Sequence, residues 1–113
     1  MAIPSGSGTE VLKRVTVHAN NAGWVEAISG TANHIYTILS IIFTDQQNAS
    51  GTLAIRINDG SNDVRILQNQ SHGAYETFVF SDKFVLEGDD DLDVYNSVTD
   101  GDWIISYIDQ DWT

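Results

Sequence analysis

Cysteine is absent from this sequence of 113 residues, and proline occurs only once. The lack of thiols excludes a disulfide framework, thiolate metal sites and a cysteine nucleophile. Long apolar stretches are missing as well, since runs such as Ile41–Phe43 are far too short to cross a bilayer. The opening segment Met1–Gly8 has neither the basic nor the apolar region of a signal peptide. We therefore expect a soluble chain without an export signal of its own.

Basic residues are scarce. The chain has 5 Lys and Arg against 16 Asp and Glu, which gives a formal net charge of −11. A field of this sign repels phosphate groups, so we predict no nucleic-acid partner and no binding to an anionic membrane. A basic protein partner or a neutral ligand remains compatible with this charge.

Helical periodicity is also missing, whereas the period of two that strands produce recurs along the chain. Val11–His18 alternates between two faces, and His34–Thr44 is apolar on both faces, which predicts a central strand. Leu53–Ile66 has the pattern of a hairpin. Gln68–Gly73 is polar, and we expect a loop there. Eight or nine short strands result.

This pattern predicts an all-β fold. So many short strands must close or fold over to cover their apolar faces, and a two-sheet antiparallel β-sandwich is the expected result. The jelly roll is the common eight-strand form of such a sandwich. With 113 residues, 42% of them hydrophobic, the chain is long enough for one core. We expect a flexible N-terminal arm over residues 1–10 and a single β-sandwich domain over residues 11–113.

The sequence offers no recognisable catalytic, cofactor-binding or metal site. His18, His34 and His72 are not within metal-ligand spacing of one another; we expect the first two near strand ends and His72 in a solvated turn. No Gly-x-Ser-x-Gly pentapeptide and no phosphate-binding glycine loop are present. Carboxylate pairs arise by chance among sixteen acids, so glycosidase chemistry has no specific support. We predict a non-enzymatic protein.

The acidic segment Asp89–Asp93, with Asp100 at the twelfth position, partly resembles a calcium loop. Its sixth position is Val94 where the sharp turn needs glycine, and its flanks have the pattern of strands rather than helices. We favour a solvated acidic loop between strands over a calcium site.

Three tryptophans are candidates for a sugar-stacking platform or for the core. Trp103 opens a strand, which favours the core, whereas the position of Trp24 is compatible with either place. Trp112 is next to the last residue of the sequence. Because a large exposed aromatic is poorly solvated, we expect Trp112 to fold back on the domain or to dock on a neighbour.

Three segments together resemble small virion structural proteins of tailed bacteriophages. They are Ile3–Arg14, Ile104–Thr113, and Phe84–Asp89 followed by Leu92–Tyr95. Capsid decoration (cement) proteins and tail-associated modules share these motifs. The resemblance implies a non-enzymatic jelly roll or related β-sandwich that assembles as a symmetric oligomer, often a trimer, on a capsid.

Two functional hypotheses follow. The first is a capsid decoration or cement protein that binds the major capsid protein and stabilises its lattice, as a homotrimer on the outer capsid surface of a virion assembled in the host cytoplasm. Its expected interface residues are Ile3, Pro4 and Trp112. The alternative is a carbohydrate- or receptor-binding module of a tail or fibre, which would use exposed aromatics and the acidic loops.

Overall fold

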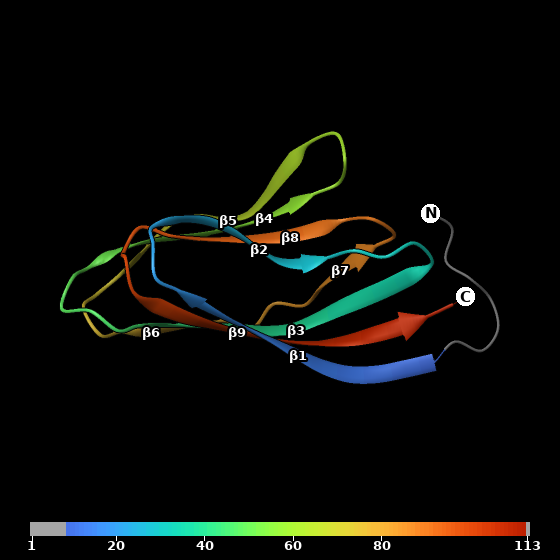
Figure 1. Cartoon of the computed structure of the whole chain (residues 1–113), viewed down its shortest axis with the longest axis horizontal. Helices are drawn as coiled ribbons and strands as arrows, with labels where there is room; N and C mark the ends of the chain where they lie inside the picture. Colours follow the sequence, from blue (N-terminus) through green and yellow to red (C-terminus); the bar gives the residue numbers. More distant parts are fainter. Residues whose placement is uncertain (1–8, 113) are drawn as a thin grey trace.

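A computed structural model describes residues 9–112 of the chain (Figure 1). This part contains strands and no helix, so it holds no helix capable of crossing a membrane. The all-β prediction is confirmed. The strands are Thr9–Ala19 (β1), Gly23–Ser29 (β2), His34–Asp45 (β3), Gly51–Asn58 (β4), Asp63–His72 (β5), Thr77–Phe80 (β6), Phe84–Glu87 (β7), Asp91–Asn96 (β8) and Gly101–Asp111 (β9).

Two antiparallel sheets pack against each other, which confirms the predicted β-sandwich (Figure 1). The first sheet has the order β1-β9-β3-β6, and β7 also pairs with β3. β6 lies beside Ile41–Thr44 and β7 beside Ile35–Ile38, so these two short strands share one side of β3. The second sheet has the order β2-β8-β4-β5. The last two strands of the described chain, β8 and β9, thus lie in the interior of the two sheets.

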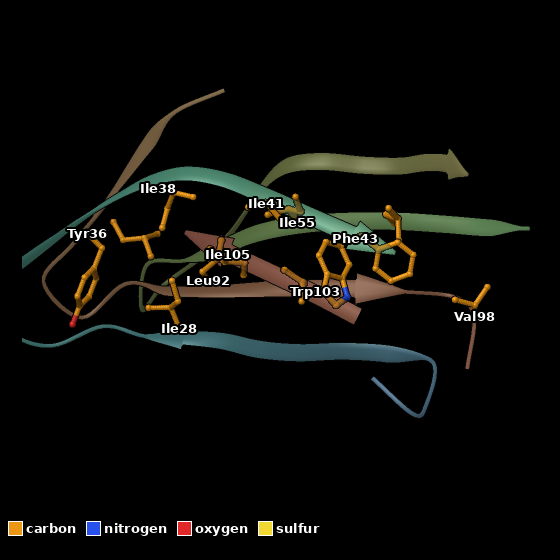
Figure 2. Packing of buried hydrophobic residues seen from close by; sticks show 13 residues of the cluster. Ile28, Tyr36, Ile38, Ile41, Phe43, Ile55, Leu92, Val98, Trp103 and Ile105 are labelled. Carbon is orange, nitrogen blue, oxygen red and sulfur yellow. The ribbon is translucent and has the colours of Figure 1, made fainter. Parts of the chain in front are cut away.

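The core lies between the sheets, where strand residues with period two point inward. Figure 2 shows the packing of this cluster. Trp103 and Phe43 are its largest fully buried side chains, and their rings lie 4.7 Å apart. The indole Nε1–H of Trp103 donates to Asn96 Oδ1 at 3.2 Å, so the buried polar atom is satisfied. The prediction that Trp103 belongs to the core is confirmed.

The expected loop over Gln68–Gly73 is wrong, because β5 continues to His72. This segment lies at the edge of the second sheet, where both outward and rim positions reach water and polar residues are tolerated. A β-bulge sets Gln68 and Asn69 opposite the single residue Ala54, and Asn69 has a positive φ of 52°. Asparagine adopts this conformation more readily than most residues.

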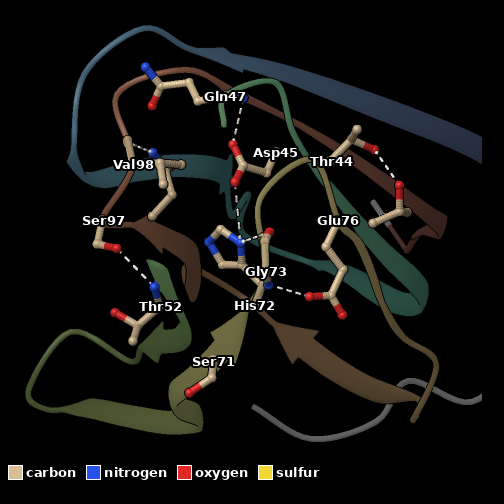
Figure 3. A network of polar contacts seen from close by, with 12 residues as sticks. Thr44, Asp45, Gln47, Thr52, Ser71, His72, Gly73, Glu76, Ser97 and Val98 are labelled. Carbon is tan, nitrogen blue, oxygen red and sulfur yellow. Dashed lines mark hydrogen bonds and ion pairs between the residues drawn. The ribbon is translucent and has the colours of Figure 1, made fainter. Parts of the chain in front are cut away.

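His72 is buried, which corrects the expectation of a solvated turn (Figure 3). Its Nδ1 lies 3.0 Å from the carbonyl oxygen of Gly73 and 3.5 Å from Asp45 Oδ2. Asp45 Oδ1 in turn accepts the backbone N–H of Gln47 at 2.8 Å. Because Asp45 ends β3 and His72 ends β5, this buried pair joins the two sheets at one end of the sandwich.

Candidate functional site

The outward face of the first sheet carries large exposed apolar side chains. Cross-strand pairing places Thr16, Ile104, Ile42 and Val79 in one row across β1, β9, β3 and β6. A second row contains Leu12, Ile108, Thr37 and Val85. We call these two rows the apolar face. They follow from the strand period, because the alternate residues Trp103 and Ile105 point into the core.

The apolar face holds four of the seven large exposed hydrophobic residues of the described chain: Leu12 at 72% exposure, Val79 at 55%, Val85 at 50% and Ile104 at 38%. Scattered single apolar residues are normal on a protein surface, but here four share one sheet face, on either side of a polar row of Arg14, Ser106 and Ser40. Apolar residues that share a face and are bordered by polar ones suit contact with another molecule. The apolar face is therefore the main candidate for a protein interface.

A second candidate site is a pocket on the outward face of the second sheet. It is lined by Trp24, Ala54, Arg65, Gln68, Asn69 and Tyr95, and its volume is about 160 Å³. The rings of Trp24 and Tyr95 lie 5.4 Å apart and are tilted by 48°. Trp24 belongs to β2 and Tyr95 to β8, and the pairing of these strands sets the two residues opposite each other.

Two of the five basic residues gather at this pocket. The guanidinium carbon of Arg56 lies 4.0 Å from the centroid of the Trp24 ring, and that of Arg65 lies 4.9 Å from it. Arg56 is also paired with Asp93 at 2.9 Å and with Asp63 at 3.5 Å. Arg65 has no ion pair within the described residues. Arg65 therefore presents a guanidinium without a direct carboxylate partner among the described residues, beside Arg56, which has two.

A cluster of titratable side chains joins β1, β3 and β9. Lys13 Nζ lies 2.8 Å from Asp109 Oδ2, and His34 Nδ1 lies 2.7 Å from Asp109 Oδ1. Burial raises the pKa of Asp109, but the hydrogen bonds from Lys13 and His34 outweigh burial and leave this pKa below its ordinary value. Through these two contacts Asp109 of β9 links β1 and β3.

The histidines lie apart from one another. His18 is exposed and pairs with Asp102 at 2.6 Å; the hydrogen bond to this carboxylate raises the pKa of His18. His34 is partly buried at the start of β3, as the sequence suggested, and His72 lies in the buried pair with Asp45. The residues from 9 to 112 hold no group of three or more His, Asp or Glu side chains placed to bind a metal ion.

The acidic segment Asp89–Asp93 directs its carboxylates to different partners. Asp90 Oδ2 accepts the backbone N–H of Glu87 at 3.1 Å, and Asp91 Oδ1 accepts that of Gly30 at 3.2 Å. Asp93 Oδ2 accepts from Arg56 Nε at 2.9 Å. Asp90 thus closes the turn between β7 and β8, Asp91 bonds the residue that follows β2, and Asp93 links β8 to β4.

The structure describes only Trp112 of the three predicted interface residues. Ile3 and Pro4 lie outside the described residues. Trp112 is half-buried, and its backbone N–H donates to the carbonyl oxygen of Asn33 at 3.0 Å, so this end of the chain folds back on its own domain. Of the other tryptophans, Trp24 lines the surface pocket and Trp103 lies in the core.

Sequence reasoning missed most of the pocket. Arg65, Gln68, Asn69 and Tyr95 come from β5 and β8, and no local motif singles them out. Period two predicts that Tyr95 points away from the core residue Val94, but it does not predict which strands lie side by side. The apolar face was missed for the same reason.

No family model and no curated protein matches the chain. Solved structures do match its fold. A chain of the T13 viral particle of IBDV superposes with a TM-score of 0.57 at 9% identity, and the match covers 98% of this chain and 35% of that one. This chain therefore spans about a third of the viral chain.

Two further matches have nearly the length of this chain. A chain of the disulfide-linked pili that form Bacillus endospore appendages has a TM-score of 0.52 at 14% identity, with 100% of this chain and 97% of that one covered. A chain of the acidic stable capsid of Helicobacter pylori bacteriophage KHP30 has a TM-score of 0.53 at 5% identity, with 92% and 93% covered. At these identities the matches show a shared β-sandwich fold.

Proposed function

We propose that this chain is a virion structural protein, and more specifically a capsid decoration or cement protein that binds the major capsid protein. The observation that carries the proposal is the apolar face on the first sheet. Leu12, Val79, Val85 and Ile104 expose hydrocarbon to water in the free chain. Burying this surface against a neighbouring polypeptide is favourable, and a protein that binds only the assembled lattice stabilises that lattice by mass action.

The structural matches support this proposal. Two of the three come from viral particles, and the bacteriophage capsid chain is matched over 93% of its length. The third belongs to a pilus, so the same fold also occurs in a fibre. All three proteins form large ordered assemblies, which agrees with a function in polypeptide contacts.

The strand order supports the jelly-roll form of the sandwich. If β6 and β7 count as one interrupted strand, eight strands pair antiparallel as β1 with β9, β2 with β8, β3 with β6–β7, and β4 with β5. This nested pairing is what results when one long hairpin folds over on itself. Jelly rolls occur in viral capsids and also in lectins, so fold alone leaves both functional hypotheses open.

The remaining features of the proposal concern assembly. A strongly acidic protein is suited to the outer surface of a capsid, away from packaged nucleic acid, and assembly in the host cytoplasm needs no cysteine. We propose a homotrimer in which Ile3, Pro4 and Trp112 contact neighbouring polypeptides. The proposed work is binding, with no catalytic step.

Binding to capsids of the parent virus tests the proposal. The double variant Val79→Thr/Val85→Thr makes the apolar face more polar, and Val64→Thr is a matched control, since Val64 is a valine of similar exposure on the second sheet. Cosedimentation with particles depleted of this protein should show reduced occupancy for the double variant and normal occupancy for the control. Equal occupancy of the particles by wild type, the double variant and Val64→Thr would show that the apolar face is not the capsid-binding surface.

Two further measurements address the finer points. Deleting residues 1–8 should weaken capsid binding, and unchanged occupancy would exclude these residues, with Ile3 and Pro4, from the interface. Light scattering should give the mass of three chains of 12.4 kDa each. A strict monomer, both free and on the capsid, would contradict the homotrimer.

A further inference from the structure

We propose that the pocket beside Trp24 binds one pyranose residue that carries a carboxylate, such as a uronic acid. This function is independent of capsid binding, because the pocket and the apolar face lie on opposite outer faces of the sandwich. The lining combines two aromatic rings, one guanidinium without a direct ion pair among the described residues, and two primary amides. Pockets that bind small ligands have this composition, with apolar walls and a few polar groups that fix orientation.

The shape of the pocket follows from the β-bulge in β5. Gln68 and Asn69 lie opposite Ala54, whose small side chain leaves room above the sheet. Asn69, with its positive φ of 52°, lies at the rim of the pocket. Bulges are frequent beside functional sites, where they direct side chains toward a ligand.

The size of the pocket restricts the ligand. Its volume of about 160 Å³ lies below the roughly 300–1,000 Å³ of sites for drug-sized molecules. One six-membered ring with its substituents is the appropriate size, and a longer chain must continue over the exposed surface. The proposed site is therefore a single sugar subsite.

The aromatic wall suits a pyranose. A pyranose ring presents C–H groups on its faces and hydroxyl groups around its edge, so it packs well on an aromatic surface bordered by polar groups. Tyr95 and the part of the Trp24 ring that the guanidinium groups of Arg56 and Arg65 leave free provide that surface; the two ring centroids lie 5.4 Å apart. The amides of Gln68 and Asn69 are exposed, make no hydrogen bond within the described chain, and have both donors and acceptors for hydroxyl groups.

Charge selects a carboxylate on the sugar. Arg56 forms ion pairs with Asp93 and Asp63. Arg65 stacks on Trp24 and has no carboxylate partner among the described residues. The planar fork of a guanidinium binds a carboxylate through two hydrogen bonds, and stacking on a ring restricts its orientation beforehand. In a chain of net charge −11, an arginine without an acidic partner in a pocket wall favours an anionic ligand.

Titration with D-glucuronate, followed by NMR at the indole N–H of Trp24, tests the proposal, with D-glucose as the neutral comparison. The buried indole N–H of Trp103, bonded to Asn96, is an internal reference that should not shift. At the binding efficiency usual for small ligands, a molecule of about a dozen non-hydrogen atoms binds with a Kd of about 1 mM. We expect D-glucose to bind at least about tenfold more weakly, because it lacks the charged hydrogen bonds.

Matched variants assign the effect to the pocket. Arg65→Gln should raise the Kd for D-glucuronate at least about tenfold, whereas Arg14→Gln, the same change of charge on the first sheet, should leave it unchanged. Asn69→Gly keeps the positive φ, which glycine accepts readily, and removes only the amide; we expect about two- to tenfold weaker binding. A normal amide spectrum establishes that each variant is folded.

Three results would each overturn the proposal. They are the absence of a saturable shift at about fifty times the expected Kd, equal affinity for D-glucose and D-glucuronate, and an unchanged Kd in Arg65→Gln. None of them bears on capsid binding, which depends on the other sheet.

Discussion

The substitution Asp109→Asn should destabilise the sandwich in a pH-dependent manner. Asp109 is 5% exposed and lies on β9 between Lys13 of β1 and His34 of β3. Asparagine has nearly the same shape but no charge. The variant therefore keeps the packing and removes the anion that faces both basic groups.

The structure sets the size of the effect. Breaking a buried ion pair by removing one partner costs about 3–5 kcal/mol. The Lys13 side chain is 45% exposed, however, so its charge stays partly solvated in the variant and the cost is smaller. We expect a loss of about 2 kcal/mol at pH 7, which lowers the Tm of a domain of this size by about 8 °C.

The pH dependence has a definite sign. The pKa of Asp109 is lower in the folded protein than the ordinary value of 3.8, so the folded state binds this proton less readily than the unfolded state does. The contribution of Asp109 to stability is complete above the unfolded pKa and is lost as pH falls through the folded pKa. Wild type should have a higher free energy of unfolding than Asp109→Asn. This difference should be constant above about pH 5 and should become smaller as the pH falls toward 3.

Urea unfolding at a series of pH values, followed by tryptophan fluorescence, measures this difference. Asp102→Asn is the matched control: Asp102 lies on the same strand, but its pair with His18 is exposed and should change the Tm little. If the difference in free energy of unfolding between wild type and Asp109→Asn stays constant from pH 6 to about pH 3, the proposed link between the pKa of Asp109 and stability is refuted. An equal Tm for both proteins at pH 7 would refute the assignment of the cluster as a stabilising one.

Three further predictions concern the core, a tight turn and a surface histidine. Asn96→Leu should cost about 1–3 kcal/mol in urea unfolding, because the indole N–H of Trp103 and the carbonyl of Val98 lose their buried partner; a double-mutant cycle with Trp103→Phe should show coupling between the two sites. Gly30→Ala places a Cβ 2.3 Å from the carbonyl oxygen of Asp90 and should cost about 1–3 kcal/mol by thermal unfolding, whereas Gly73→Ala, whose Cβ meets only the flexible Glu76 side chain, should cost less. The pKa of His18, measured by NMR titration, should lie above 6.5 in wild type and return toward that value in Asp102→Asn. An unchanged pKa in the variant would exclude the hydrogen bond to Asp102 as the cause of the raised pKa.

The local hydrophobic pattern predicted the positions of the strands well, but it predicted where each strand ends less accurately. His34–Thr44 is apolar on both faces because one face of β3 packs in the core, where Ile41 and Phe43 lie, and the other, with Ile42, belongs to the apolar face. Gln68–Gly73 is polar, yet most of it belongs to β5, because hydrophobic periodicity is weak in an edge strand with a bulge. The burial of His72 depends on Asp45, a residue 27 positions away in a different sheet, which no local rule detects.

The candidate sites depend almost entirely on which strands become neighbours. Lys13 and Asp109 are 96 positions apart in the sequence, and His34 and Asp109 are 75 apart. Alternation predicts that Ile104 faces outward once Trp103 is assigned to the core, but the apolar face exists only because β1, β3 and β6 join β9 in one sheet. The composition does show that the chain has few cations. An arginine in the lining of a pocket, such as Arg65, is therefore a candidate binding group.

The interior positions of β8 and β9 have a consequence for biosynthesis. β8 separates β2 from β4, and β9 separates β1 from β3, so neither sheet is continuous until residues 91–111 have been translated. The nascent chain therefore exposes unpaired strand edges until residues 91–111 have left the ribosome, and neither sheet can be completed before that point. Pairing of strands so distant in sequence is intrinsically slow. During that interval the high negative charge keeps nascent copies apart by electrostatic repulsion.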